Sequence, residues 1–97
     1  MSQRTILRMQ SVFEELCVQS LIPRFGKQFK LNVVVEYSNE NGNVDLSLRY
    51  DGNLFNPLTD GDELSVMIVK GACDSSAYQA VDGREGYTNE VKLSLKK

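Results

Sequence analysis

Two stretches in which apolar and polar residues alternate flank an Asn-Gly step, and this pattern constrains the fold more than any other feature. The apolar members are Phe29, Leu31, Val33, Val35 and Tyr37 in the first stretch and Val44, Leu46, Leu48 and Tyr50 in the second. A period of two is typical of a strand that buries one face. The intervening Asn41-Gly42 favours the positive φ angles of a hairpin turn. The pattern therefore predicts an antiparallel hairpin of half-buried strands.

Two segments instead repeat their apolar residues every three or four positions, as an amphipathic helix does. The first runs from Thr5 to Ser20, and we expect Pro23 to end it. Its stripe is Ile6, Met9, Val12, Phe13, Leu16 and Cys17. The second begins near Asp62 and ends near Cys73-Asp74. Its stripe is Leu64, Met67, Ile68, Gly71 and Ala72.

The C-terminal part predicts a second hairpin, with strands at 76–81 and 87–96 joined by a turn at 82–86. In the last strand we expect Val91, Leu93 and Leu95 to point inward and Glu90, Lys92 and Ser94 to point outward. The order is αββαββ. The predicted fold class is α+β, a two-layer sandwich in which a four-stranded, mainly antiparallel sheet of two hairpins carries two helices on one face. Residues 1–97 form a single domain.

Charge and composition exclude several classes of protein. With 11 basic and 13 acidic residues the net charge is −2, so no basic field favours nucleic acid. No apolar run approaches the roughly 18 residues that span a bilayer, so we expect no membrane insertion. No apolar segment follows the N-terminal residues, so we expect no signal peptide and a cytoplasmic protein. Cys17 and Cys73 could form one disulfide, but the chain lacks the dense cysteine spacing of a secreted scaffold, so we expect two buried free thiols.

The chain has no histidine. This excludes Ser-His-Asp and Cys-His catalysis and removes the commonest transition-metal ligand. Any chemistry must therefore use carboxylates, lysines, tyrosines or a cofactor.

The loop from Tyr50 to Leu64, between the first hairpin and the second helix, is the expected place for a small ligand. It contains two glycines, an Asn-Pro step and three aspartates, which is more than a simple connection needs. Helix capping explains the acidic residues Asp60 to Glu63 better than a cation site, because the spaced oxygen ligands of a calcium loop are missing.

Motifs along the chain then line up with a known family. Glu15 is followed four residues later by Gln19, Tyr50-Asp51-Gly52 is followed by Phe55-Asn56-Pro57-Leu58, and the second helix begins at Gly61-Asp62-Glu63-Leu64-Ser65. The last hairpin contains Thr88-Asn89-Glu90-Val91-Lys92-Leu93. In this order the motifs resemble the histidine kinase-like ATPase domain of the GHKL or Bergerat fold, closest to the bacterial anti-sigma serine-kinase-like branch. The resemblance begins at the family's first motif helix, as it would in a piece of a larger protein.

The resemblance implies ATP and Mg²⁺ as ligands. It implies that Glu15 is the catalytic carboxylate, which orients the attacking group, and that Gln19 stands where the family has a metal-binding asparagine. The longer side chain of glutamine displaces the amide oxygen from an octahedral site with ligands at roughly 2.1 Å.

The other implied nucleotide-binding positions are Tyr50, Asp51, Gly52, Gly61 and Asn89. Tyr50 replaces the aspartate that binds adenine, and Asp51 points to the other face of the strand. Glu63-Leu64-Ser65-Val66 replaces the glycine-rich phosphate motif, so a carboxylate lies where phosphate is expected.

These departures predict a degenerate ATPase-like domain that acts as a regulatory or protein-interaction module with weak or no ATP binding and a protein partner. The alternative is a functional anti-sigma-type serine/threonine protein kinase domain. A small α+β domain without a ligand is a third hypothesis, and its exposed sheet edge would favour a homodimer by strand pairing.

The same residues have simpler interpretations. Glu15 and Gln19 are also what a solvated helix flank contains, Tyr50 is also a packed aromatic residue at a strand end, and Asp51-Gly52-Asn53 is also an ordinary turn.

Overall fold

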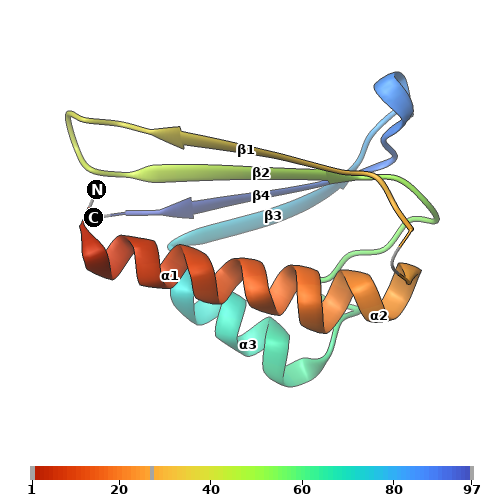
Figure 1. The fold of residues 1–97 in the computed structure, drawn as a ribbon, viewed down its shortest axis with the longest axis horizontal. Helices are drawn as coiled ribbons and strands as arrows, with labels where there is room; N and C mark the ends of the chain where they lie inside the picture. The colour runs from red at the N-terminus through yellow and green to blue at the C-terminus, as the bar shows by residue number, and fades with distance from the viewer. Residues whose placement is uncertain (1, 27, 97) are drawn as a thin grey trace.

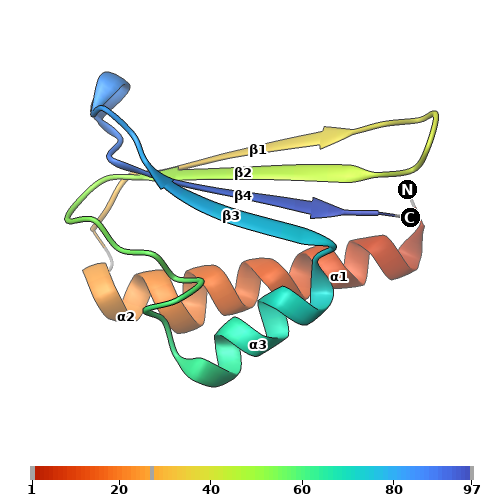
Figure 2. The ribbon, with the colours of Figure 1, turned by 180° about the vertical axis from the view of Figure 1, so that it is seen from behind.

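The computed structural model describes residues 2–26 and 28–96 and consists of a sheet with helices on one of its faces (Figure 1). The four strands are antiparallel to their neighbours and follow the order β1-β2-β4-β3. Figure 2 shows from behind that both helical segments lie on the same side of the sheet. This is the predicted two-layer α+β arrangement, in the predicted order.

The first helical segment is longer than the sequence pattern indicates. It runs without interruption through α1 (Gln3–Phe13), η1 (Glu14–Leu21) and α2 (Ile22–Phe25), and η1 is a π-helix. The expected end at Pro23 is therefore wrong. Proline ends an ordinary α-helix because its ring collides with the carbonyl four residues back. Here wider π turns precede Pro23, which lies in the first turn of α2, and the segment ends at Gly26 with φ +79°.

The π turns also change which residues face the core. Leu16 and Leu21 are five residues apart, yet each is only 1% exposed. In an α-helix a five-residue step would turn them to different faces. Ile6 lies in α1, before the π turns; the α-helical stripe placed it inward, but it is 40% exposed.

The first hairpin forms as predicted, with β1 (Leu31–Tyr37) paired to β2 (Val44–Tyr50) and Tyr37 opposite Val44. Gly42 has φ +73°, and the Asn41 side chain accepts a hydrogen bond from the Asn43 N–H at 2.9 Å. Positive φ at this glycine is what the Asn-Gly step predicts.

α3 (Glu63–Ala72) begins at the predicted place but presents a different face to the core. The Asp62 side chain caps it by accepting from the Ser65 N–H at 3.2 Å. Ser65 and Val69 are buried, whereas Leu64 and Met67 are each 65% exposed. The predicted stripe was therefore wrong at Leu64, Met67 and Gly71, all three of which are exposed, because the buried face is shifted by one residue.

The second hairpin contains β3 (Ser75–Ala80), the short helix η2 (Arg84–Gly86) and β4 (Asn89–Leu95). Val91, Leu93 and Leu95 point inward as predicted. Since β4 also pairs with β2, the two strands with the most buried apolar residues lie side by side in the middle of the sheet.

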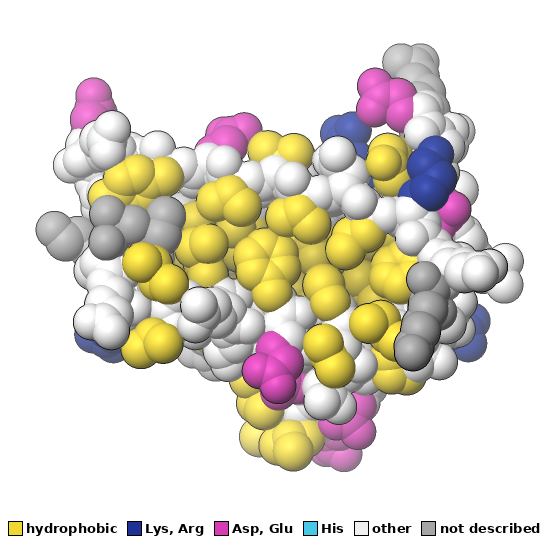
Figure 3. Space-filling view, in the orientation of Figure 1, with side chains coloured by type: hydrophobic (Ala, Val, Ile, Leu, Met, Phe, Trp, Pro, Cys, Tyr) yellow, Lys and Arg dark blue, Asp and Glu magenta, His cyan; other side chains and the backbone are white. Residues whose placement is uncertain are grey.

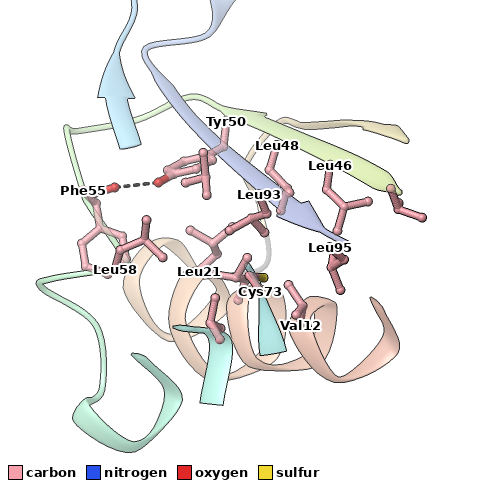
Figure 4. Close-up of a cluster of buried hydrophobic side chains, with 14 residues drawn as sticks. Val12, Leu21, Leu46, Leu48, Tyr50, Phe55, Leu58, Cys73, Leu93 and Leu95 are labelled. Atoms are coloured by element: carbon pink, nitrogen blue, oxygen red, sulfur yellow. Dashed lines mark hydrogen bonds between the residues drawn. The ribbon is translucent and has the colours of Figure 1, made fainter. Parts of the chain in front are cut away.

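The hydrophobic core lies between these central strands and the helices (Figure 4). Its buried members are Val12, Leu16, Leu21, Val44, Leu46, Leu48, Tyr50, Phe55, Leu58, Val69, Cys73, Val91, Leu93 and Leu95. Among the described residues, no helix is both long enough and apolar enough to cross a membrane.

Candidate functional site

Tyr50 and Asn89 stand at the end of the sheet from which the loop of residues 51–62 departs. They are register partners on β2 and β4, and both are 0% exposed. The Tyr50 hydroxyl donates to the Phe55 carbonyl at 2.6 Å (Figure 4). The Asn89 Oδ1 accepts from the Phe55 N–H at 2.9 Å. Both polar groups of the Phe55 backbone are thus held by side chains of adjacent strands.

The rest of the Asn89 amide is also occupied within the chain. Its Oδ1 accepts from the Tyr78 hydroxyl at 2.5 Å. Its Nδ2 donates to the Tyr50 carbonyl at 3.4 Å, to the Asn53 carbonyl at 3.3 Å and to the Thr88 hydroxyl at 3.2 Å. A buried amide engaged in this way fixes the start of the loop to the sheet.

Burial sets the ionisation of the two tyrosines in this cluster. Loss of hydration raises the pKa of Tyr50 far above its ordinary value of 10.0, and the nearby Tyr78 adds to the shift. Burial likewise raises the pKa of Tyr78. Both hydroxyls are therefore protonated donors at neutral pH.

Asp51 and Gly52 hold the first residues of the same loop in place. Asp51 Oδ1 accepts from the Lys30 N–H at 2.8 Å, and the Asp51 N–H donates to the Lys30 carbonyl at 3.3 Å. Gly52 has φ +94°, and a Cβ there would lie 2.8 Å from the Phe25 ring. The Thr88 hydroxyl donates to the Gly52 carbonyl at 2.7 Å. Only glycine allows this backbone to lie so close to Phe25.

Gly61 lies where the loop meets the first helical segment. A Cβ at this position would be 2.6 Å from the Pro57 carbonyl oxygen and 3.2 Å from the Ser20 Oγ. Gly61 is therefore needed for the close approach to the Pro57 carbonyl within the loop, and it also lies beside Ser20 of η1, the residue that follows Gln19.

Glu15 and Gln19 do not join this cluster. Glu15 is half-buried and Gln19 is exposed, and neither side chain forms a hydrogen bond or an ion pair with residues 2–26 or 28–96. No group of three or more Asp, Glu or Cys residues lies close enough to hold a metal ion in the described part of the chain. The single neutral oxygen of Gln19 does not fit a Mg²⁺ ion held by protein groups, which normally include a carboxylate.

The buried polar side chains around Asn89 are all engaged within the chain. Within the described residues, every buried side-chain nitrogen or oxygen has a hydrogen-bond partner. A preformed nucleotide site would normally expose several convergent polar groups in a cleft.

The open face of the sheet carries a polar cluster that the sequence pattern did not indicate. Glu90 points outward as predicted but is only 2% exposed. Its carboxylate accepts from Arg49 Nε at 2.7 Å and from Gln79 Nε2 at 2.5 Å. Burial acts to raise the pKa of Glu90, but these hydrogen bonds outweigh it and hold the pKa below the ordinary value. The cluster lines a concavity of about 670 Å³.

The opposite face of the sheet is incompletely covered. The first-strand residues Leu31, Val33, Val35 and Tyr37, which we call the β1 row, are 38–45% exposed. They pair with residues of β2 that are at most 1% exposed, so both sets lie on the helix side. The expectation that this strand is half-buried was wrong, because the helices cover β2 and β4 but leave β1 open. Figure 3 shows the resulting band of hydrophobic side chains between the sheet and the first helical segment.

The structure is thus an α+β domain. Its loop of residues 51–62 is fixed to the sheet by Tyr50 and Asn89, and the apolar side chains of β1 are exposed at one edge of the sheet. A scan against models of protein families finds no match to this chain. Searches of curated proteins and of solved structures also find none.

Proposed function

We propose that this chain is a GHKL-type regulatory module that works through protein interaction and binds ATP weakly or not at all. The observation that carries the proposal is the engagement of Asn89. The resemblance implies an adenine contact there, yet both polar atoms of its amide are bonded within the chain. Opening such a buried contact for a ligand costs about 1–3 kcal/mol for each group left unsatisfied.

The substitution at Tyr50 supports the same conclusion. The family position carries a carboxylate that accepts from adenine, whereas Tyr50 is a protonated donor directed at Phe55. The Tyr50 side chain is 0% exposed, so no part of it is open to a ligand. Nucleotide recognition at this end of the sheet would require the loop to move.

The apolar band along β1 supplies the interaction surface. Contiguous exposed apolar surface on a small domain typically marks a contact with another protein. The four residues of the β1 row lie on one face of the strand and are each 38–45% exposed. A cytoplasmic location agrees with Cys17 and Cys73 being free.

A phosphoryl-transfer assay tests this proposal against the kinase alternative. Wild-type protein and Glu15→Ala are incubated with Mg²⁺ and γ-labelled ATP, and phosphate release and protein labelling are counted. We expect both proteins to match the protein-free control. Phosphate release or protein labelling by the wild type that Glu15→Ala abolishes would overturn the proposal, and only the labelling of protein would establish the kinase.

A further inference from the structure

The free edge of β1 presents a row of unpaired backbone groups. At one end of the strand the Ser38 N–H donates to the Asn43 carbonyl at 3.0 Å, and at the other the Asp51 N–H donates to the Lys30 carbonyl at 3.3 Å. Even-numbered residues of this segment therefore bond to β2. Because the direction alternates along an antiparallel strand, the N–H and C=O groups of the β1 row point away from the sheet.

The same residues carry the exposed apolar side chains. The four residues of the β1 row therefore present both unpaired backbone groups at the sheet edge and apolar side chains on the helix side. Each of these residues is 38–45% exposed. An added strand would satisfy the backbone groups and extend the apolar face at the same time.

β1 is complementary to itself in an antiparallel register centred on Val34. In this register Leu31 faces Tyr37 of the other copy and Val33 faces Val35, so that every member of the β1 row meets an apolar residue. Only outward-pointing backbone groups pair with each other, as the ladder requires. All seven residues of the strand take part.

Charge agrees with this register. On the open face Asn32 lies opposite Glu36, and Val34 meets its own copy, so no like charges face each other. The other edge strand, β3, contains Ser75, Ser76 and Gln79, and Tyr78 is its single large hydrophobic residue. Self-pairing is therefore favoured at β1 and not at β3.

We propose that a second copy of this chain pairs antiparallel with β1 about a two-fold axis at Val34, which joins two four-stranded sheets into one. This inference rests on the proposed function only in treating the β1 surface as an interaction surface. Tight ATP binding or ATP turnover would refute the proposed function without changing the mass of the assembly, so the two proposals can fail separately.

The first test is the oligomeric state of the whole chain by sedimentation velocity, from about 1 μM to about 1 mM, a range that covers weak dimers. We expect a reversible dimer. Val33→Pro removes an outward N–H without touching a bond to β2, and we expect it to give a monomer. Ala80→Pro is the matched control on the β3 edge, where alternation from the Val81–Thr88 bond also points the N–H outward, and we expect it to remain dimeric.

The second test fixes the register and does not depend on proline being tolerated. Non-hydrogen-bonded partners in an antiparallel pair have Cα atoms about 4.5 Å apart, which a disulfide can bridge. Val34→Cys should therefore cross-link under mild oxidation, whereas Asn32→Cys, four residues from its own copy in this register, should match the wild type. A wild type that is monomeric at every concentration would overturn the proposal and leave the edge to a different polypeptide. A dimer that does not cross-link at Val34→Cys would overturn it as well.

Discussion

Tyr50 and Asn89 face each other across β2 and β4, and each holds one polar group of the Phe55 backbone. One side chain donates to the carbonyl, and the other accepts from the N–H. The loop that follows β2 is therefore fixed by two buried side chains instead of being free to admit a ligand. This pair links the fold to the proposed loss of nucleotide binding.

Tyr50→Phe keeps the ring and removes the donor to the Phe55 carbonyl. Because a buried acceptor then lacks a partner, we expect the free energy of unfolding to fall by about 1–3 kcal/mol in a urea titration. Tyr37→Phe is the matched control, since Tyr37 is 39% exposed. Its effect should stay within about 0.5 kcal/mol. Equal effects in the two variants would contradict the role given to the Tyr50 hydroxyl.

Asn89→Ala should destabilise the protein more than Tyr50→Phe, because Asn89 bonds to several groups that it would leave unsatisfied. The two residues share Phe55, so their effects should not add. In a double-mutant cycle we expect a coupling energy of about 0.5–3 kcal/mol. Strict additivity would show that the two contacts to Phe55 are independent.

Arg8 connects three elements near the other end of the fold. Its guanidinium donates to the Ala72 carbonyl at 3.0 and 2.6 Å, to the Lys96 carbonyl at 2.9 Å and to Asp74 at 3.2 Å. The Ala72 carbonyl, at the end of α3, otherwise lacks a helical partner. We expect Arg8→Ala to lower the free energy of unfolding by about 1.5–3 kcal/mol.

Two further variants make the Arg8 prediction specific. Arg8→Lys should lower the free energy of unfolding by less than Arg8→Ala but should not match the wild type, because an ammonium group cannot form the several hydrogen bonds of the planar guanidinium. Arg4→Ala, one turn earlier at an exposed position, should change stability by less than about 0.5 kcal/mol. If Arg4→Ala and Arg8→Ala were equally destabilising, the loss of a positive charge on the helix would explain both effects, and the hydrogen bonds of the Arg8 guanidinium would not be needed.

Asp74 gives the protein a defined response to acid. The backbone N–H of Lys96 and then the Arg8 guanidinium lower the pKa of Asp74 from 3.8 in the folded state. A carboxyl group with a lowered folded pKa stabilises the fold above the unfolded pKa, and this contribution is lost as pH falls through the folded value. The stability difference between wild type and Asp74→Asn should therefore be constant at neutral pH and shrink below pH 3.8. Urea titrations across this range measure it, and a difference that grows in acid would contradict the assignment.

The arrangement of helices and strands follows from short-range patterns. Alternation and the Asn41-Gly42 step predict the first hairpin, and the three inward residues of β4 predict the second. These elements agree with the structure because their periods depend on local geometry. The face that a helix buries is harder to predict from such patterns. The spacing of apolar residues predicts that Leu64 and Met67 point inward, but the Asp62 cap and the burial of Val69 turn them outward.

The candidate site was harder to predict, because its contacts join residues far apart in the chain. The sequence pointed to the positions of Tyr50 and Asn89 but not to their shared contact with Phe55. The exposure of the β1 row depends on which strands the helices cover, and no local sequence pattern predicts this. Glu90 was predicted to point outward, yet its burial depends on Arg49 and Gln79 from neighbouring strands.

Thermal unfolding in the presence of Mg-ATP decides whether this domain binds nucleotide. A ligand at 100 times its Kd stabilises the folded state by about 2.7 kcal/mol, and each kcal/mol shifts the Tm of a domain of this size by about 4–8 °C. We predict no saturable rise in Tm up to about 5 mM nucleotide, a concentration 100 times a Kd of about 50 μM. A saturable rise in Tm of about 10 °C or more would show that the domain binds ATP and would point to the end of the sheet at Tyr50 and Asn89 as the nucleotide site.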